Sequence, residues 1–312
     1  MINLKNKKIV VTGASSMIGR STTKILKERG AIVIPLFHED YDLVEYAQAL
    51  KAFKKHKPDY CIHLAGYSGN VQFNKDYPSD IFYNTVAMGL NTLKAASECG
   101  VEKIVSALAS CSYRSVDCEL KEEDFWIGLP DRTSEGHGLG KKTIHAFSRQ
   151  ISRQYNTTAV CTIFNTAYGP YDSFDVNKTK VIGGLIKKFV DAEKNNLPEV
   201  ECWGTGRPRR EFIYCDDAAE GVVQALEKYD FVDLPLNIGF NEDISIKELA
   251  EIIKVATNYQ GRLFWNTEKP DGQFRKILDS SRMKEFGVSI ENRINLLEGL
   301  EKTIGWYQEN EM

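Results

Sequence analysis

The sequence predicts an α/β protein built on a Rossmann-type, doubly wound parallel sheet, with a smaller C-terminal α/β lobe that binds the substrate. Three observations lead to this prediction. Short β-branched runs alternate with stretches of helical spacing, a turn containing Gly13 and Gly19 joins the first run to the first helical stretch, and loops rich in Gly, Pro, Asp and Asn follow Asn165. Strands that alternate with helices form a parallel sheet with right-handed crossovers.

The expected elements follow one another as strand and helix. Strands are expected at residues 8–12, 31–36, 60–65, 103–108 and 159–164. Helices are expected at residues 17–29, 44–55, 82–98 and 141–155. Six strands in all favour a doubly wound sheet, to which residues 211–217 and a helix over 218–228 are expected to return.

The chain is expected to divide into two domains. The dinucleotide-binding domain takes residues 1–165 and about 208–240, and the substrate lobe takes about 166–207 and 241–312. An amphipathic helix near 181–194 and a strand at 199–203 belong to the lobe.

Composition and charge exclude several classes of protein. A chain of 312 residues with 42% hydrophobic and 27% charged side chains is typical of globular proteins and not of disordered or collagen-like ones. The net charge of −3 gives no reason to expect nucleic-acid binding. The N-terminus lacks signal-peptide features and no apolar run approaches ~18 residues, so we expect a cytoplasmic protein that does not bind membranes. Seven scattered cysteines without Cys-x-x-Cys spacing predict neither disulfides nor a metal site.

The turn between the first strand and first helix is the predicted pyrophosphate site. Backbone N–H groups at a helix N-terminus bind anions, and the candidate cofactor contacts here are Gly13, Ser15, Ser16, Met17, Ile18 and Gly19. The alternative is a strand-to-helix turn that only packs tightly. Ser16 stands where this motif often has a glycine, so its side chain either narrows the approach or donates its hydroxyl to the phosphate.

The end of the second strand bears on the choice between NAD and NADP. An acidic residue there binds the adenosine 2′-OH, whereas an arginine favours a 2′-phosphate. Glu39 and Asp40 follow this strand and no arginine does, so a nicotinamide dinucleotide is expected, NAD or NADP with a slight preference for NAD. The alternative is that both carboxylates only solvate a loop.

Eight segments spread over nearly the whole chain carry a family pattern, namely 63–66, 74–80, 110–113, 168–174, 203–206, 210–212, 269–272 and 275–276. Together they resemble one family, the GDP-L-fucose synthases (GDP-4-keto-6-deoxymannose epimerase-reductases) among the extended short-chain dehydrogenase/reductases. The resemblance implies that the predicted lobe binds a nucleotide sugar.

The resemblance implies catalytic positions, and this sequence departs from the family at several of them. The family uses Ser, Tyr and Lys at the sugar C4, but its Tyr-x-x-x-Lys motif is here His137 to Lys141, and its Ser is Ala109 beside Ser110. The family's epimerising Cys and His are here Cys111 and Lys180. The candidate catalytic residues are therefore Ser110, Cys111, His137, Lys141 and Lys180.

Each replacement leaves two interpretations open. His137 is either a proton donor, since the unperturbed pKa of histidine is about 6.5 and Lys141 lowers it, or a ribose contact in a protein without efficient redox chemistry. An imidazole is also shorter than a phenol and reaches less far toward the C4 oxygen. Cys111 is either a proton-transfer group whose thiolate Lys180 stabilises or a packed thiol. Lys180 acts as an electrostatic partner or, if desolvated, as a base.

The resemblance also implies the remaining ligand contacts. Further cofactor contacts are expected at His38, Asp42, Leu64, Ala65, Gly66, Lys141, Phe164, Asn165 and Ala167. Substrate contacts are expected at Lys180, Val181, Lys188, Trp203, Arg210 and Lys276, of types that suit a nucleotide diphosphate, since Arg forks onto pyrophosphate and Trp stacks on a base.

Together these features predict an NAD(P)-dependent enzyme that acts on a GDP-linked 4-keto sugar. It is expected to be an epimerase, a C4 reductase or dehydrogenase, or an enzyme that combines epimerisation with the C4 reaction. Two alternatives are a non-catalytic nucleotide-sugar or dinucleotide-binding protein of the same fold and a redox-neutral isomerase with tightly held NAD. A homodimer is expected by resemblance, with helices 82–98 and 141–155 pairing into a four-helix bundle.

Overall fold

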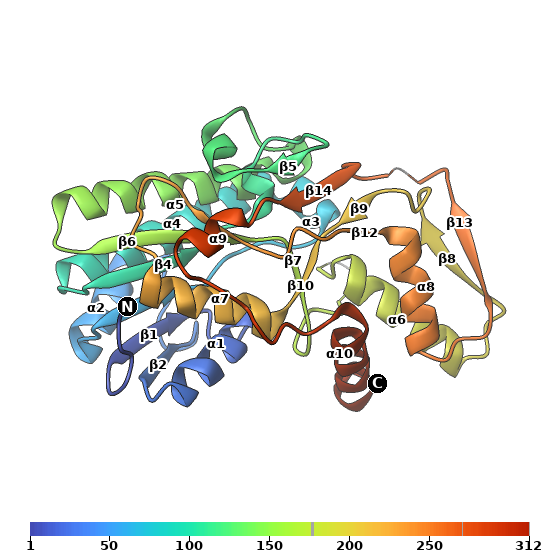
Figure 1. Ribbon diagram of the computed structural model, residues 1–312, viewed down its shortest axis with the longest axis horizontal. Helices are drawn as coiled ribbons and strands as arrows, with labels where there is room; N and C mark the ends of the chain where they lie inside the picture. The colour runs from blue at the N-terminus through green and yellow to red at the C-terminus, as the bar shows by residue number, and fades with distance from the viewer. Residues whose placement is uncertain (176–177, 270, 312) are drawn as a thin grey trace.

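The central element is a parallel sheet that matches the predicted fold class. The computed structural model describes residues 1–175, 178–269 and 271–311, so Val176, Asn177, Pro270 and Met312 of the predicted lobe lie outside the described residues. Six strands pair in the order β11-β6-β4-β3-β1-β2 (Figure 1). Their bounds are β1 Lys8–Thr12, β2 Ile32–Leu36, β3 Tyr60–His63, β4 Lys103–Ala107, β6 Thr158–Phe164 and β11 Leu236–Ile238. The strand order reverses between β1 and β3, the point at which doubly wound sheets bind ligands.

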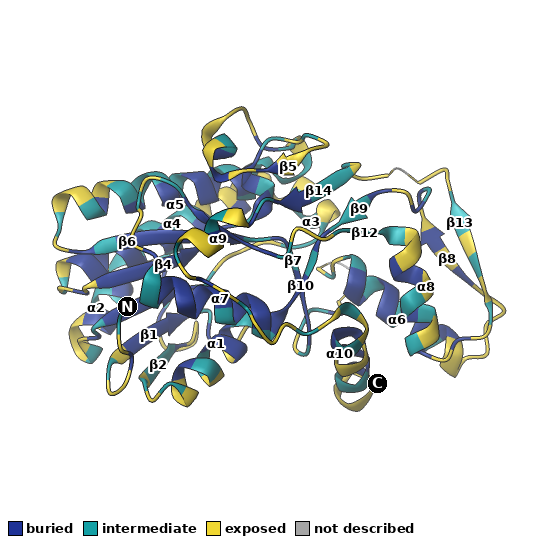
Figure 2. Ribbon diagram, in the orientation of Figure 1, coloured by how far each residue is buried: buried dark blue, intermediate teal, exposed yellow. Residues whose placement is uncertain are grey.

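Helices cover both faces of this sheet. One face carries α1 (Met17–Glu28) and α7 (Cys215–Lys228), which pack on each other; the other carries α2 (Tyr46–His56), α4 (Pro78–Glu98) and α5 (Glu135–Gln154). Alternate residues of β1 enter the two cores, because side chains of a strand point to opposite faces. Figure 2 shows the sheet buried between the exposed outer surfaces of the helices.

Two expectations about the elements are wrong, one about where a helix begins and one about which sheet a strand joins. The helix predicted at 141–155 begins at Glu135, which places His137 and Lys141 one turn apart on the same helix. Residues 211–217 do not return to the main sheet: β10 (Phe212–Tyr214) pairs with β7 (Thr166–Tyr168), and β11 is the sixth strand. The helix expected after them does return, as α7.

The smaller lobe extends from one end of the sheet (Figure 1). It contains α6 (Val181–Lys194), α8 (Ile246–Ala256), α10 (Leu296–Asn310) and a parallel pair formed by β8 (Glu199–Trp203) and β13 (Arg262–Asn266). A second small sheet has the order β12-β9-β14-β5, with bounds Ile244–Ser245, Arg209–Arg210, Arg275–Leu278 and Glu119–Leu120. Short helices complete the described chain, namely α3 (Val71–Asp76), α9 (Ser281–Glu285), η1 (Ser110–Ser112), η2 (Glu122–Trp126) and η3 (Arg132–Ser134).

A buried carboxylate ties the sheet to the lobe. Glu211 accepts hydrogen bonds from Asn165 Nδ2 at 2.7 Å, the Leu278 amide at 3.0 Å and the Phe240 amide at 2.8 Å. These donors belong to the end of β6, to β14 and to the loop after β11. Burial raises the pKa of Glu211, and the hydrogen bonds oppose that rise. The carboxylate of Glu211, just before β10, therefore connects the end of β6 with β14 and the loop after β11.

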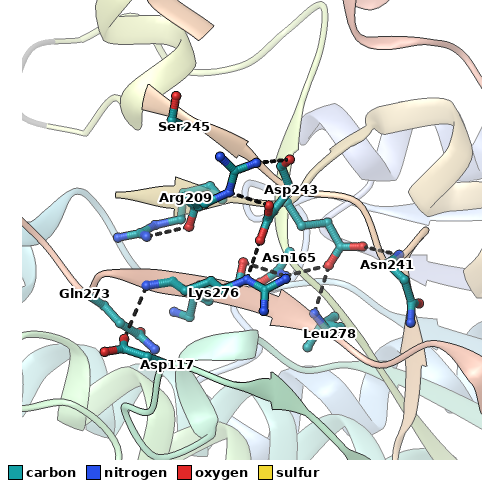
Figure 3. Close-up of polar contacts among 12 residues, drawn as sticks. Asp117, Asn165, Arg209, Asn241, Asp243, Ser245, Gln273, Lys276 and Leu278 are labelled. Atoms are coloured by element: carbon teal, nitrogen blue, oxygen red, sulfur yellow. Dashed lines mark hydrogen bonds and ion pairs between the residues drawn. The ribbon is translucent and has the colours of Figure 1, made fainter. Parts of the chain in front are cut away.

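A second carboxylate fixes the neighbouring strands of the lobe. Asp243 accepts from Arg209 Nε at 2.6 Å and from Arg275 Nε at 2.5 Å, and so bridges β9 and β14 (Figure 3). Both arginines lower the pKa of Asp243 against the opposing effect of burial. Among the described residues, no helix is both long and apolar enough to span a bilayer.

Candidate active site

The turn after β1 has the shape of a dinucleotide cradle. Gly13 adopts a positive φ of 65°, and a Cβ there would lie 2.8 Å from the Ala65 amide nitrogen. A Cβ at Gly19 would collide with the Gly13 carbonyl. Glycines at both positions therefore let the turn, α1 and the end of β3 approach one another closely, as a bound pyrophosphate at this helix N-terminus requires.

Ser16 uses its hydroxyl within the turn. It is the N-cap of α1, where its Oγ accepts from the Gly19 amide at 3.1 Å and donates to the Gly13 carbonyl at 2.7 Å. In this structure the hydroxyl hydrogen is engaged by the Gly13 carbonyl, and donation to a phosphate stays a prediction that needs this hydrogen bond to break. Ser15 and Ser16 are both exposed, as a ligand-facing turn requires.

The end of β3 lies against this turn. Thr12 Oγ1 accepts from the amides of Leu64 and Ala65, each at 3.2 Å, and is hydrogen-bonded to His63 Nδ1 at 2.9 Å. A Cβ on Gly66 would lie 3.6 Å from Lys141 Nζ. Four predicted cofactor segments, at residues 13, 15–19, 64–66 and 141, are thus brought together, and they fit a dinucleotide.

Other predicted cofactor contacts have different surroundings. His38 is largely exposed after β2, with Nδ1 3.9 Å from Asp42 Oδ1. Phe164 is the last residue of β6, and its side chain is partly buried. Ala167 lies in β7 and is packed in the hydrophobic core of the protein. Asn165 donates to Glu211, while its Oδ1 is buried and has no hydrogen-bond partner among the described residues. The Ala167 side chain is therefore unavailable to a ligand, and Asn165 has a structural partner.

Cys111 and His137 are in direct contact. Cys111 belongs to η1, which follows β4, and His137 to the first turns of α5; Sγ and Nδ1 are 3.4 Å apart, a hydrogen-bonding distance for sulfur. Gly138 permits this contact, since a Cβ there would lie 2.6 Å from the Cys111 carbonyl oxygen. The sequence predicted separate steps for these two residues and did not predict that they touch.

Lys141 and Ser110 complete the predicted catalytic set. One turn beyond His137, Lys141 is buried and donates from Nζ to the Ala107 carbonyl at 2.8 Å. Burial lowers the pKa of Lys141 to about 8. Ser110 is buried in η1 beside Cys111, and its carbonyl accepts from the Tyr113 amide at 3.2 Å.

The surroundings of His137 keep its ring neutral. Removal from water lowers its pKa to about 3, and the positive charges of Lys141, Lys180 and Lys276 add to this effect. The charge of Lys141 lowers the pKa of His137, as predicted. The total change in this pKa, to about 3, is larger than predicted, and the expectation that His137 titrates near neutrality is wrong. At pH 7 the ring is an imidazole and not an imidazolium.

The predicted substrate contacts form two groups. Arg210 and Lys276 are register partners in β9 and β14, and Lys180 caps α6 next to Val181. Burial lowers the pKa of Lys276, to which the charges of Arg210 and Lys180 also contribute, so these cations share one region with His137. The second group lies farther along the lobe and contains Lys188 and Trp203.

Two lysines lie close to the Trp203 ring. Lys188 Nζ is 5.0 Å and Lys269 Nζ 5.5 Å from the ring centroid, and the tryptophan is 61% exposed. Lys188 also donates to the Glu201 carbonyl at 2.9 Å. An exposed aromatic face flanked by cations suits a nucleobase and its phosphates.

Three residues at the site were not predicted. Asp172 interacts with Lys180, Asp131 with Lys276, and Lys269 contacts Trp203. Burial raises the pKa of Asp172. Asp172 and Lys269 lie within segments that carry the family resemblance, so a signal was present, whereas Asp131 stands before α5 in a loop without a motif. Within the described ranges, no group of three or more His, Cys, Asp or Glu side chains has an arrangement that could hold a metal.

Known proteins resemble this chain over almost its whole length. Residues 9–239 match the NAD dependent epimerase/dehydratase family. A GDP-L-colitose synthase of Yersinia pseudotuberculosis is 32% identical over 306 residues, which cover 96% of this chain and 97% of that protein.

Solved structures agree with this result. A GDP-L-fucose synthetase from Naegleria fowleri bound to NADP superimposes with a TM-score of 0.91 at 25% identity, covering 98% of this chain and 94% of that one. A GDP-6-OMe-4-keto-L-xylo-heptose reductase from C. jejuni does so with a TM-score of 0.90 at 26% identity, covering 99% of each chain. The predicted resemblance and fold class are confirmed, but the expected preference for NAD receives no support, because the Naegleria structure holds NADP.

Proposed function

Because the chain belongs to the NAD dependent epimerase/dehydratase family, we propose that this enzyme reduces a GDP-linked 4-keto sugar at C4, with epimerisation at the neighbouring carbons. The observation that carries the proposal is the convergence of Cys111, His137 and Lys141 beside the dinucleotide cradle, with Lys180 and Lys276 facing them. NADP(H) is the proposed form of the cofactor, by analogy with the Naegleria relative.

Each group of residues has a task in this proposal. The cofactor, when bound, supplies the hydride for C4. The turn from Gly13 to Gly19 binds its pyrophosphate and Lys141 its ribose, as the resemblance implies. His137 faces the C4 oxygen, while Cys111 and Lys180 act at the epimerisable carbon, where Lys180 provides a positive charge for an enolate oxygen.

The nucleotide is assigned to the lobe. Arg210 and Lys276 bind the diphosphate, since a guanidinium offers two parallel donors to its oxygens. The base binds farther along the lobe, near Val181, Lys188 and Trp203. We assign residues 1–165 and about 208–240 to the dinucleotide domain and the remaining ranges to the substrate lobe.

A reductase that does not epimerise is the second candidate. It is supported by the similarity to the heptose reductase, whose name specifies reduction of a 4-keto sugar, and by Lys180 standing where the family has a histidine. Proton exchange distinguishes the two: an epimerase incorporates solvent deuterium at carbons next to the carbonyl, and a simple reductase does not.

Turnover with GDP-4-keto-6-deoxymannose and NADPH tests the proposal. We expect reduced nicotinamide to disappear as the C4 alcohol forms, and His137→Ala to lower the rate by ~10²-fold or more. Arg207→Ala is the matched control, because Arg207 is exposed and bonded to neighbouring Thr205. Product without loss of NADPH would identify a redox-neutral isomerase, and tight binding without product would identify a binding protein.

We also propose a homodimer formed through α4 and α5. The support is an apolar surface where these helices meet, with Tyr83 63% and Phe82 38% exposed, beside a groove lined by Pro78, Arg132, Glu135, Gly136 and Leu139. A cytoplasmic location and the absence of nucleic-acid, membrane and metal partners stay predictions.

A further inference from the structure

The Cys111–His137 contact bears on which nitrogen of the imidazole carries the proton. A neutral imidazole has one donor and one acceptor nitrogen, and a thiol is a weak donor. If the thiol donates to Nδ1 across the 3.4 Å contact, the ring proton resides on Nε2. Nε2 is then the nitrogen that is free to donate to a ligand.

A neutral ring alone is a poor source of a proton. Three lysines act on His137, namely Lys141 from its own helix, Lys180 from the start of α6 and Lys276 from β14. They oppose storage of an extra proton on the ring before the reaction. The ring can release its Nε2 proton only if another proton arrives at Nδ1 at the same time.

Two of these lysines also lie near the sulfur. Lys141 approaches Cys111 from α5 and Lys276 approaches it from β14. A negative charge that develops on the sulfur as a proton leaves it would therefore lie beside two cations.

We propose that Cys111 and His137 form a proton relay that serves C4 reduction, with the thiol as the proton source where the family uses a tyrosine. As the C4 oxygen gains negative charge, the Nε2–H bond breaks and the O–H bond forms. The electron pair on Nδ1 takes the thiol proton, and the S–H electron pair stays on sulfur as a thiolate. One proton passes from sulfur to the sugar oxygen, the ring is neutral before and after, and solvent reprotonates the thiolate. The relay rests on the proposed C4 reductase activity.

Single-turnover reduction tests the relay. The substrate is the GDP-4-keto-6-deoxy sugar that already has the product's configuration at C3 and C5, so that loss of epimerisation cannot interfere. We expect Cys111→Ala to slow loss of NADPH by ~10²-fold or more. In a His137→Tyr background the phenol brings its own proton, and there Cys111→Ala should change the rate little.

The two proposals fail in different ways. A wild-type protein that reduces no GDP-linked 4-keto sugar overturns the function and the relay together. A wild-type protein that turns over while Cys111→Ala reacts equally fast overturns the relay alone. The relay is also overturned if Cys111→Ala costs as much in the His137→Tyr background as in the wild type.

A measurement without substrate or cofactor guards against misfolded variants. In nitrogen-15 spectra of the labelled wild-type protein at neutral pH, we expect His137 as the tautomer protonated on Nε2, and a shift toward the other tautomer in Cys111→Ala. A wild-type ring that is protonated on Nδ1, or on both nitrogens, contradicts the relay.

Discussion

Histidine at position 137 changes which proton the site can hold. A tyrosine keeps its own acidic hydrogen, whereas this imidazole is neutral, pairs with Cys111 and is surrounded by lysines. The residue types were predictable from the family resemblance. The contact was not, because the two residues are 26 positions apart and only the packing of α5 on η1 brings them together. The size of the pKa change depends first on burial of the ring and then on lysines from two further elements, neither of which the sequence places.

Lys141 gives the site a pH dependence. Its pKa is lowered to about 8, so the ammonium form dominates below that pH and the neutral amine above it. The ammonium attracts the negatively charged cofactor, and we therefore expect the Kd for NADPH to rise as pH increases through about 8. Fluorescence titration across this range measures the change. Lys141→Met should bind weakly at every pH and lose the step; a step that persists in this variant would assign it to another group.

The strands and helices were predictable where periodicity is strong. The alternating pattern located five parallel strands of the main sheet, β1, β2, β3, β4 and β6, because buried strands are rich in β-branched residues. The start of α5 was missed because Gly136, Gly138 and Gly140 weaken the helical signal. β10 and β11 each have only 3 residues, too few for a clear pattern. The apolar β10 was therefore predicted as the sixth strand, although it pairs with β7 and β11 pairs with β6.

The packing of α5 against η1 depends on Gly138. An alanine there would meet the Cys111 carbonyl and push the helix away, so we expect Gly138→Ala to lower the free energy of unfolding by about 1–3 kcal/mol and to slow turnover. Gly305→Ala is the control, because Gly305 lies in α10 with open space around it and should gain up to about 1 kcal/mol. Chemical denaturation measures both. Equal stability of the two variants would show that α5 does not need this close approach.

In the whole molecule, the residues of the candidate site come from two parts, the main sheet with its helices and the smaller lobe. The sheet provides the cofactor cradle, Cys111 and His137, and the lobe provides Lys180, Arg210, Lys276 and Trp203. Glu211 and Asp243 hold the connecting strands through charge-assisted hydrogen bonds. The loops rich in Gly, Pro, Asp and Asn after Asn165 led to the prediction of a separate lobe, and the exact division of the chain stays a prediction. The junction was not, because its hydrogen bonds join residues far apart in the chain.

The proposed dimer depends on the exposed apolar surface of α4. Tyr83→Glu adds a charge to the exposed surface of α4 and should convert a dimer into a monomer in light scattering with size-exclusion chromatography. Val255→Glu is the control, since Val255 is 72% exposed on α8, away from the proposed interface. A wild-type protein that elutes as a monomer at all concentrations rules out the dimer.

Transfer of an isotope label tests the central claim most directly. The wild-type protein is incubated with a GDP-linked 4-keto sugar and NADPH that carries deuterium at the transferable nicotinamide position. We predict a product with deuterium at the sugar C4, formed in step with oxidised cofactor. A product without the label, or a cofactor that keeps it while the sugar is bound or rearranged, would contradict the account.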